Sequence, residues 1–336
     1  MRPRVLSWCS ILIVGVALSL SLRMLPRKAY NVTPLGMPGT ENCTAYALND
    51  RGQVVGEAET PEGRPYAFLW KDGRMTDLGM LGGSHSCAYA LNDRGQVVGV
   101  TWTPTGQELA FLWQRGRMQA LGTLGGKTTV AYGINDAGQV VGCSQLSNGD
   151  MHACLWDHGR MVDLGTLGGR HSCACAINPD GHIVGRSQVS GGQTHAFYYE
   201  QGRMQDLGTL GGENSQANAI NASNEVVGAS DTRDAELHAF RFRQGRIEDI
   251  GPIGVANSTA YAINDAGQVV GTAQNETLQD QQSFLWVLSG HESRRLPAMH
   301  IKEWNLGAPV ALNNGGQVAA TGCDLGKNIA LLLSPR

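Results

Sequence analysis

The sequence predicts an all-β chain: a seven-bladed β-propeller of four-stranded antiparallel blades, closed by an N-terminal strand that pairs into the last blade. Three observations predict it: the glycine content, a long internal repeat, and complementary ends of the chain. Glycine accounts for 45 of the 336 residues, about twice the usual share of about 7%, which indicates many turns between short strands. A chain of this length ordinarily suggests two domains, but one repeat fills residues 30–336 as a single domain.

The repeat is marked by an asparagine-led turn, most often Asn-Asp-x-Gly, which follows an apolar pair. The leading asparagines lie 43 residues apart from Asn49 to Asn264, and the last interval is 49 residues. Such regularity indicates that each unit packs against the next in the same way. The seven turns begin at Asn49, Asn92, Asn135, Asn178, Asn221, Asn264 and Asn313.

The third unit shows the four strands that we expect in each. They cover residues 131–135, 139–143, 152–156 and 160–164, and residues 165–169 cross to the next unit. The Asn-Asp-x-Gly turn, Asn148-Gly149 and residues 157–159 separate them, and each turn ends in a glycine that can take a positive φ. Four strands in about 43 residues is the size of a propeller blade.

The two ends of the chain predict a closed ring. The last unit begins near Pro309 and stops at Arg336, one strand short, whereas residues 30–36 align with the fourth strand at 74–79 of the first unit. An open array would expose two sheet edges, so we expect the N-terminal strand to complete the last blade. The third strands carry aromatic residues that we expect between blades: Trp70, Trp113, Trp156, Tyr199 and Trp286.

Residues 1–29 predict a signal peptide or a membrane anchor. The 18 residues from Val5 to Leu22 are apolar and uncharged, and Arg2 and Arg4 precede them. This layout fits a cleaved leader and equally a spanning helix. We therefore expect an exported protein, periplasmic or extracellular, with residues 5–22 as a possible membrane tether. The net charge of −3 argues against a nucleic-acid partner, and we expect a monomer.

Several motifs resemble the bacterial extracellular HAF repeat. They are the Leu-Gly-x-Leu-Gly-Gly and Ile-Asn-x-x-Gly-x-Val-Val-Gly elements and the runs at residues 66–70, 195–197 and 238–240. The resemblance covers nearly all of the chain after residue 30 and implies an exported bacterial protein. It supplies neither a catalytic residue nor a ligand. Cys154 replaces the motif's Phe, and Asn224 replaces its Gly.

Recurrent histidines and arginines have structural explanations. His152, His195 and His238 occupy equivalent positions in successive units, too far apart to share an ion at ligand distances near 2.0–2.1 Å. We expect each ring N–H to make a local hydrogen bond, and we expect no metal and no cofactor. One arginine in each of five units reads as a solvated residue at the rim: Arg74, Arg117, Arg160, Arg203 and Arg246.

One pair of cysteines raises the question of a disulfide. A two-residue turn at Asn148-Gly149 would place Cys143 opposite Cys154, at a separation that is within disulfide range and can carry strain. The sequence leaves that bridge open, and the other cysteines of the repeat read as small buried residues.

Ligand-binding residues are expected in the crossovers ahead of the inner strands, near the mouth of the central channel. These loops vary most between repeats, and loops on a rigid scaffold are the usual place for binding. Their mixture of acids, bases, amides and imidazoles suits a polar ligand such as a glycan or peptide, or a protein partner. The candidates are Glu41, Asn42, His85, Lys127, Arg170, His171, Glu213 and Asn214.

Two functions follow from this set. The first is a non-catalytic binding or interaction scaffold, which we favour because the loops are short and only weakly acidic. The alternative is a carbohydrate hydrolase or lyase at the channel mouth, with Glu41 or Glu213 as acid/base and His85 or His171 assisting. That chemistry requires two such groups within about 10 Å of each other. No residue is assigned a catalytic role.

Overall fold

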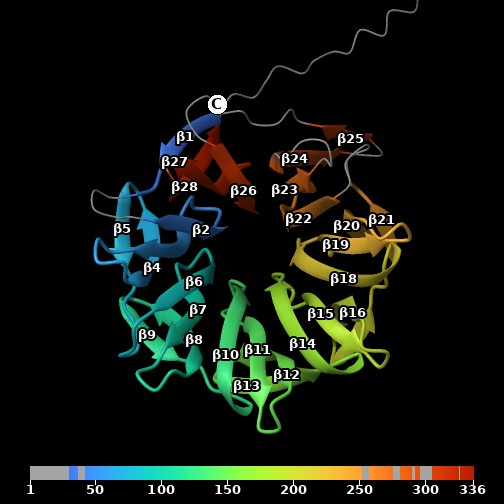
Figure 1. The fold of residues 1–336 in the computed structure, drawn as a ribbon, viewed down its shortest axis with the longest axis horizontal. Coiled ribbons are helices and arrows are strands. Elements are labelled where there is room, and N and C mark those ends of the chain that lie inside the picture. Colours follow the sequence, from blue (N-terminus) through green and yellow to red (C-terminus); the bar gives the residue numbers. More distant parts are fainter. Residues whose placement is uncertain are drawn as a thin grey trace, which may run out of the picture.

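The computed structural model describes residues 30–36, 42–251, 257–274, 281–289, 292–295, 305–324 and 326–336. These residues form 28 strands, arranged in sheets around a central axis (Figure 1). The predicted leader or anchor at 1–29 and the candidate Glu41 lie outside the described residues. Within the described ranges, no helix has the length and apolar character needed to cross a membrane.

The strands follow one another as antiparallel four-stranded meanders. The first is β2 (Cys43–Leu48), β3 (Val54–Glu59), β4 (Pro65–Lys71) and β5 (Arg74–Asp77). The fourth is β14 (Gly168–Ile177), β15 (Ile183–Val189), β16 (Thr194–Glu200) and β17 (Arg203–Asp206). The fifth is β18 (Gly211–Ile220), β19 (Val226–Thr232), β20 (Leu237–Arg243) and β21 (Arg246–Asp249). The sixth is β22 (Asn257–Ile263), β23 (Gln268–Gln274), β24 (Gln281–Ser289) and β25 (Glu292–Arg295).

Two neighbouring meanders share one eight-stranded sheet, because residues Thr128 and Glu108 form a parallel pair between them. One half is β6 (Ser86–Leu91), β7 (Val97–Trp102), β8 (Glu108–Gln114) and β9 (Arg117–Ala120). The other half is β10 (Gly125–Ile134), β11 (Val140–Leu146), β12 (Met151–Asp157) and β13 (Arg160–Gly165).

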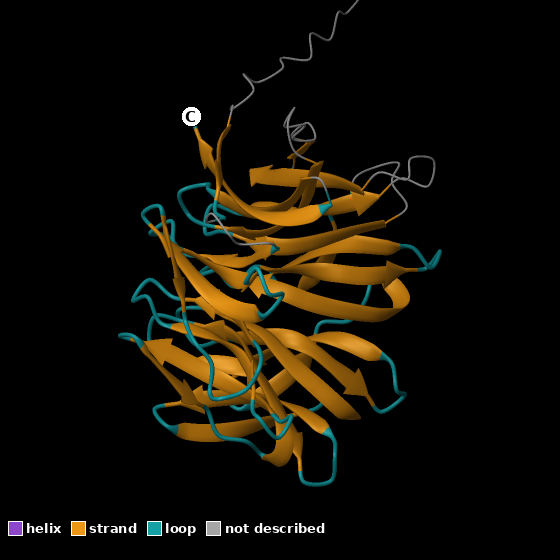
Figure 2. Ribbon diagram, turned by 60° about the vertical axis from the view of Figure 1, so that its left-hand side comes forward, coloured by secondary structure: helices purple, strands orange, loops and turns teal. Residues whose placement is uncertain are grey.

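The last sheet joins the two ends of the chain, as predicted. Its order is β1 (Tyr30–Pro34), β28 (Lys327–Pro335), β27 (Val318–Asp324) and β26 (Asn305–Leu312). Strand β1 runs antiparallel to β28, with Tyr30 opposite Pro335 and Val32 opposite Leu333. The N-terminal strand thus completes a sheet whose other three strands come from the C-terminal part of the chain. The sheets overlap face to face around the axis (Figure 2).

The core lies between neighbouring sheets. A representative cluster joins Val55 and Ala67 of one sheet to Ala88 and Phe111 of the next. The inner strands present small residues to this interface, and each of these alanines is fully buried: Ala45, Ala88, Ala131, Ala174, Ala217 and Ala260. Because blades converge near the axis, a large face fits there only against a small one.

The predicted third-strand aromatics pack in this core, but they are not its most buried rings. Trp156 is buried, and Trp70, Trp113 and Tyr199 are partly buried against the clusters. The fully buried aromatics stand two residues earlier on the third strands: Phe68, Phe111, Phe197 and Phe240. Trp286 belongs to a strand whose side chains are not described.

The glycine of each Val-Val-Gly element permits the inner and second strands to pair closely. A Cβ on Gly99 would lie 1.9 Å from the main-chain oxygen of Cys87, and one on Gly142 would lie 1.9 Å from that of Val130. No side chain fits at that separation, so glycine is required there by close approach and not by turn formation.

The predicted pairing of Cys143 with Cys154 is wrong by one residue. Cys143 stands opposite Ala153, and Cys154 stands opposite Gly142. The reason is the hairpin: Leu146 pairs with Asp150 across a loop of three residues, and its glycine has a φ of +94°. Three-residue loops with a left-handed residue are a common hairpin type. Both cysteines are buried free thiols.

The turns between third and fourth strands have positive φ at two successive residues, as at Asp72 (48°) and Gly73 (78°). Both values are those of a type I′ hairpin turn. The residue that follows each such turn is exposed, which confirms the expectation for the rim arginines Arg74, Arg117, Arg160, Arg203 and Arg246.

Candidate functional site

Seven asparagines at the ends of the inner strands form a closed hydrogen-bonded ring. The side-chain amide of Asn49 donates to the main-chain oxygen of Asn92 at 3.0 Å, and each asparagine does the same to the next. The ring ends where Asn313 donates to the main-chain oxygen of Asn49, also at 3.0 Å. All seven are buried: Asn49, Asn92, Asn135, Asn178, Asn221, Asn264 and Asn313.

Each asparagine also stabilises its own turn. The side-chain oxygen of Asn49 accepts from the main-chain N–H of Gln53 at 2.9 Å, while its amide donates to the Gln53 side chain at 2.8 Å. An amide side chain combines an acceptor with two donors. It can therefore accept from its own turn and still donate twice, once within the turn and once to the neighbouring blade. A carboxylate donates no hydrogen bond and a hydroxyl donates only one.

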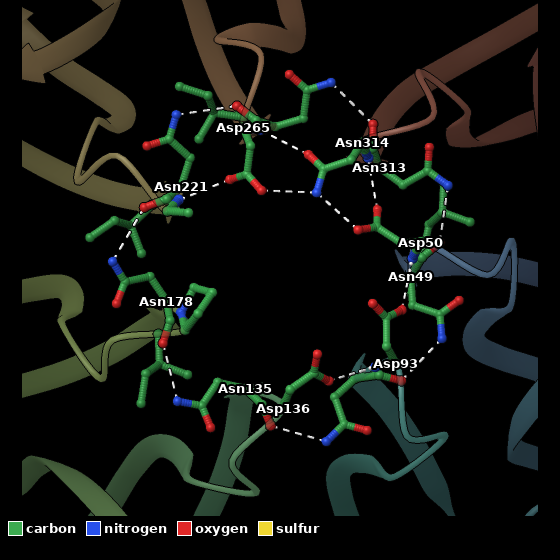
Figure 3. Close-up of a pocket in the computed structure, with 18 of the residues that line it drawn as sticks. Asn49, Asp50, Asp93, Asn135, Asp136, Asn178, Asn221, Asp265, Asn313 and Asn314 are labelled. Carbon is green, nitrogen blue, oxygen red and sulfur yellow. Dashed lines mark hydrogen bonds between the residues drawn. The ribbon is translucent and has the colours of Figure 1, made fainter.

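The next residue of each turn forms a second ring, nearer the axis (Figure 3). The main-chain N–H of Asp50 donates to Asp93 at 3.0 Å, and that of Asp93 donates to Asp136 at 2.9 Å. The main-chain N–H of Ala222 makes the same bond to the carboxylate of Asp265, with the nitrogen and oxygen 2.9 Å apart. One oxygen of each carboxylate accepts from a main-chain N–H of the preceding blade, and this hydrogen bond fixes the position of the side chain.

Asn314 takes the place of an aspartate in this second ring. Its side-chain oxygen accepts from the N–H of Asp265 at 2.9 Å, as an aspartate oxygen does elsewhere. Its amide nitrogen donates to Asp50 and to Asp265, both at 2.9 Å. One neutral side chain therefore links two carboxylates without adding a charge.

Pro179 and Ala222 interrupt the second ring in a matched way. Proline has no N–H to donate, and the following blade has Ala222, which has no side-chain acceptor. The interruption leaves one sector of the ring without carboxylates, between Asp136 and Asp265.

The two rings surround a cavity of about 280 Å³ on the axis. Its wall also includes the last apolar residue of each inner strand, such as Leu48 and Ile134. The cavity therefore has an apolar wall and a polar rim with four carboxylates: Asp50, Asp93, Asp136 and Asp265.

The carboxylates of this rim repel one another. Burial raises the pKa of Asp93 above its ordinary value, and the negative charges of Asp50 and Asp136 raise it further. The hydrogen bond from the Asp50 N–H and the charge of Arg51 act in the opposite direction. A positively charged group at the rim would relieve this repulsion.

The crossover residues that were predicted from the sequence, in so far as the structure describes them, do not line this cavity. They begin the inner strands at the end opposite the asparagine turns, where the chain passes over the third strand of the preceding blade. His171 Nδ1 accepts from the main-chain N–H of Met151 at 3.1 Å, and Asn214 accepts from that of Thr194 at 3.0 Å. The prediction placed these residues at the channel mouth. The two hydrogen bonds place both residues beside the third strand of the preceding blade, and their position at the mouth of the channel stays a prediction.

The other described candidates are held in the same region. Arg170 forms an ion pair with Asp150 at 2.6 Å. The ring of His85 stacks on Trp102 at 4.2 Å and lies 3.3 Å from Glu57. The side-chain amide of Asn42 donates to Glu59, and its oxygen accepts from the Asn328 N–H. The main-chain N–H of Lys127 donates to the Gln145 side chain. Glu213 is exposed.

The structure does not bring these candidates into contact with one another. In the described part of the chain, no hydrogen bond or ion pair joins two of them. Their contacts fasten a crossover to its neighbours, and a role in ligand binding stays a prediction.

The recurrent histidines make the local hydrogen bonds that we predicted. The Nδ1–H of His195 donates to Asp206 at 2.8 Å, and the other oxygen of Asp206 accepts from the Gly208 N–H at 2.7 Å. His152 with Asp163 and His238 with Asp249 repeat this arrangement. Among the described residues, no group of three His, Cys, Asp or Glu side chains is placed to hold a metal ion.

No protein-family model and no curated protein matches the sequence, so the resemblance to the HAF repeat stays a prediction. Among solved structures, a puromycin-hydrolysing peptidase of Mycobacterium tuberculosis is similar, with a TM-score of 0.59, 13% identity and coverage of 89% of this chain and 52% of that chain. A prolyl endopeptidase has a TM-score of 0.59 and 10% identity over 88% of this chain and 50% of that chain.

This chain thus spans about half the length of both peptidases. A six-bladed fucose-binding lectin from Aleuria aurantia has 13% identity over 79% of this chain and 97% of the lectin. Its TM-score of 0.41 is too low to support an argument. Likeness at such identities shows the fold alone: the chain is an all-β propeller of four-stranded antiparallel blades.

Proposed function

We propose that this chain is a closed, seven-bladed propeller that acts as a non-catalytic binding scaffold. Its ligand is a polar molecule with a positively charged or donor-rich end, bound at the rim formed by Asp50, Asp93, Asp136 and Asp265. The observation that carries this proposal is the axial cavity of about 280 Å³ with four carboxylates at its polar rim.

Seven blades are supported by the asparagine ring. It contains one member per repeat, and its last bond spans 264 residues from Asn313 to Asn49. Equivalent turns can complete such a circle only if the repeats surround one axis.

The chemistry of the rim favours a cationic ligand. An ionised carboxylate accepts about four hydrogen bonds and donates none. One oxygen of Asp93 accepts from the main-chain N–H of Asp50, and its second oxygen can accept from a ligand. An ammonium or guanidinium group would supply donors and reduce the repulsion that raises the pKa of Asp93.

The size of the cavity limits what enters it. Pockets for drug-sized molecules usually measure about 300–1,000 Å³, and this one is slightly smaller. It fits the end of a longer ligand: one basic peptide side chain or one amino sugar. Peptides and glycans, the two classes expected from the sequence, can each present such an end.

The alternative of a carbohydrate hydrolase or lyase receives no support from the contacts of His85, His171 and Glu213, which lie in different crossovers. Export to the periplasm or cell exterior, a tether through residues 5–22, a monomeric state and membership of the HAF-repeat family remain part of the proposal. The N-terminal apolar run supports export and the tether, and the repeat motifs support membership of the HAF-repeat family.

Peptide and glycan arrays test this proposal with the full-length chain. We expect the bound probes to be lysine- or arginine-containing peptides or amino sugars, and neutral glycans to be left unbound. The D50N/D93N/D136N variant should lose these signals. Asparagine keeps one oxygen that accepts from the neighbouring N–H, as Asn314 already does, so the main-chain bonds of the ring are preserved while three charges are removed. At position 50 the second bond, from the Asn314 amide, is lost.

The matched control is a K127A/E213A variant, which changes the opposite end of the inner strands. It should bind as the native chain does. Loss of binding in that variant, with retention in D50N/D93N/D136N, would transfer the site to the crossovers and overturn the proposal.

A further inference from the structure

A bulge interrupts the pairing of the inner and second strands in every sheet. In the first sheet Ala45 pairs with Gly56 and Ala47 with Val55, which leaves Tyr46 as the extra residue. Bulges re-aim a side chain away from the regular pleat. The bulged residues are Tyr46, Tyr89, Tyr132, Cys175, Asn218, Tyr261 and Val310.

The bulged side chains of successive blades meet around the axis. The rings of Tyr46 and Tyr89 have centroids 5.5 Å apart, and those of Tyr89 and Tyr132 are 5.3 Å apart. Cys175 occupies the next position in this circle and is only partly buried. A thiol therefore stands where three preceding blades place a phenol ring.

Cys175 belongs to a cluster of three thiols. The thiol of Cys173, two residues earlier on β14, interacts with those of Cys175 and Cys143, and Cys173 and Cys143 pack in the same buried cluster. Cys143 comes from β11 of the preceding blade, opposite Val130. All three are free.

A guanidinium group accompanies the thiols. Arg186 stands directly opposite Cys173 in the pairing of β14 with β15, and its Nη1 donates to Gln216 Oε1 at 2.7 Å. The hydrogen bond from Cys173 lowers the pKa of Cys175, and the charge of Arg186 lowers it further, although burial acts in the opposite direction.

The other thiols differ from Cys175. Burial raises the pKa of Cys43 to about 12 and raises the pKa of Cys154 well above its ordinary value. Hydrogen bonds with Cys143 and Cys175 raise the pKa of Cys173. Reactive cysteines are partly exposed thiolates near a positive charge, with a second thiol beside them in redox-sensitive sites. In the described part of the chain, Cys175 alone unites these features.

We propose that Cys175 and Cys173 form a redox-sensitive dithiol inside the propeller, which is oxidised by hydroperoxides. The Cys175 thiolate attacks the terminal peroxide oxygen, the O–O bond breaks, and the departing alkoxide takes a proton from water to become an alcohol. Cys175 is then a sulfenic acid. The sulfur of Cys173 attacks it, an S–S bond forms, the S–O bond breaks, and the hydroxyl leaves with the Cys173 proton as water.

The electrons of this reaction balance. Two thiols lose two electrons and become a disulfide, while the hydroperoxide gains two and becomes an alcohol and water. The bulge gives Cys175 its position beside Cys173, and Arg186 acts as a positioning residue that favours the thiolate. This dithiol is independent of the carboxylate rim, so either proposal can fail without the other.

The test uses hydrogen peroxide with the reduced full-length chain, followed by peptide mapping. The peptide that holds Cys173 and Cys175 should lose two hydrogen atoms, and a reducing agent should restore them. The C175S variant should not form this disulfide. The C173S variant should accumulate a sulfenic acid at Cys175 that dimedone captures. C323S, at an exposed thiol, is the matched control and should behave as the native chain.

A second measurement requires no change in the core. Alkylation by iodoacetamide at about pH 6.5, roughly two units below the ordinary thiol pKa of about 8.5, should label Cys175 before the more exposed Cys323. The R186M variant should slow labelling of Cys175 several-fold, because removal of the positive charge lowers the fraction of Cys175 that is thiolate, and R186K should restore most of the rate. Earlier labelling of Cys323, or peroxide oxidation that leaves the Cys173–Cys175 peptide reduced, would overturn the proposal.

Discussion

The side-chain amide of Asn313 donates to the main-chain oxygen of Asn49 at 3.0 Å, although 264 residues separate them. This bond is the same one that every asparagine of the ring makes to its successor 43 or 49 residues later. A contact between the last and first repeats thus has the form of a contact between neighbours. Together with the β1–β28 pairing, it makes the repeat array a circle.

Replacement of Asn313 should therefore cost as much as replacement of an asparagine in the middle of the chain. We expect N313A and N135A each to lower the free energy of unfolding by about 1–3 kcal/mol, since each leaves buried polar groups without partners. Urea denaturation measures both. A negligible effect of N313A beside a large effect of N135A would indicate that the ring is open at this contact.

Two glycines of the second blade differ in whether a side chain would fit at their position. G99A should destabilise the protein by about 3 kcal/mol or more, because its Cβ would meet the Cys87 oxygen at 1.9 Å and the strands would have to separate. G122A is the control: no atom lies within 4 Å and φ is not positive, so its effect should stay within about 0.5 kcal/mol. Similar unfolding midpoints for the two would show that the strands do not approach so closely.

The pair of His195 and Asp206 should be energetically coupled. Asp206 also accepts from the Gly208 N–H, so D206A alone measures more than the histidine bond. A double-mutant cycle with H195L isolates the pair, and we expect a coupling of about 0.5–1 kcal/mol. The second blade has Leu109 and Ala120 at the equivalent positions, whereas the first blade keeps Asp77 beside Tyr66. Additive effects of H195L and D206A would contradict the assigned bond.

Removal of the Asp93 charge should stabilise the fold at neutral pH. A raised pKa means that the native state binds the Asp93 proton more readily than the unfolded chain does. The native state is thus penalised above the raised pKa, and the penalty disappears as the pH falls below the ordinary value of 3.8.

D93N should therefore gain roughly 0.2–1 kcal/mol near pH 7, the range of close exposed charge pairs, and the gain should shrink in acid. Thermal unfolding of D93N and the native chain across this pH range measures it. A loss of stability at pH 7 would mean that the charge of Asp93 is favourable.

Much of the fold could be predicted from the sequence because its signals are repeated. The 43-residue period, the turn residues and the missing last strand indicate the blades and the role of residues 30–34. Register was less predictable. A three-residue loop at Gly149 shifts the pairing by one residue and separates Cys143 from Cys154, and nothing in the pair Asn148-Gly149 distinguishes it from a two-residue turn.

The site was less visible for a different reason. Asp50 and its equivalents could be recognised as turn residues, but a turn motif does not say that its second side chain faces an axis. The period contained that information, because equivalent positions in a ring must surround one centre. The bulge that places Cys175 beside Cys173 left no comparable signal, since Tyr46 and Cys175 continue the apparent alternation of the inner strand.

The central claim is that the carboxylate rim binds the ligand, and calorimetric titration tests it most directly. The titration uses the basic peptide or amino sugar that gives the strongest array signal, with the native chain and with D50N/D93N/D136N, at low and at high salt. We predict at least a tenfold weaker affinity in the variant, about 1.4 kcal/mol, and a salt dependence that the variant loses. Equal affinity of the two proteins at both salt concentrations would contradict the assignment of the site.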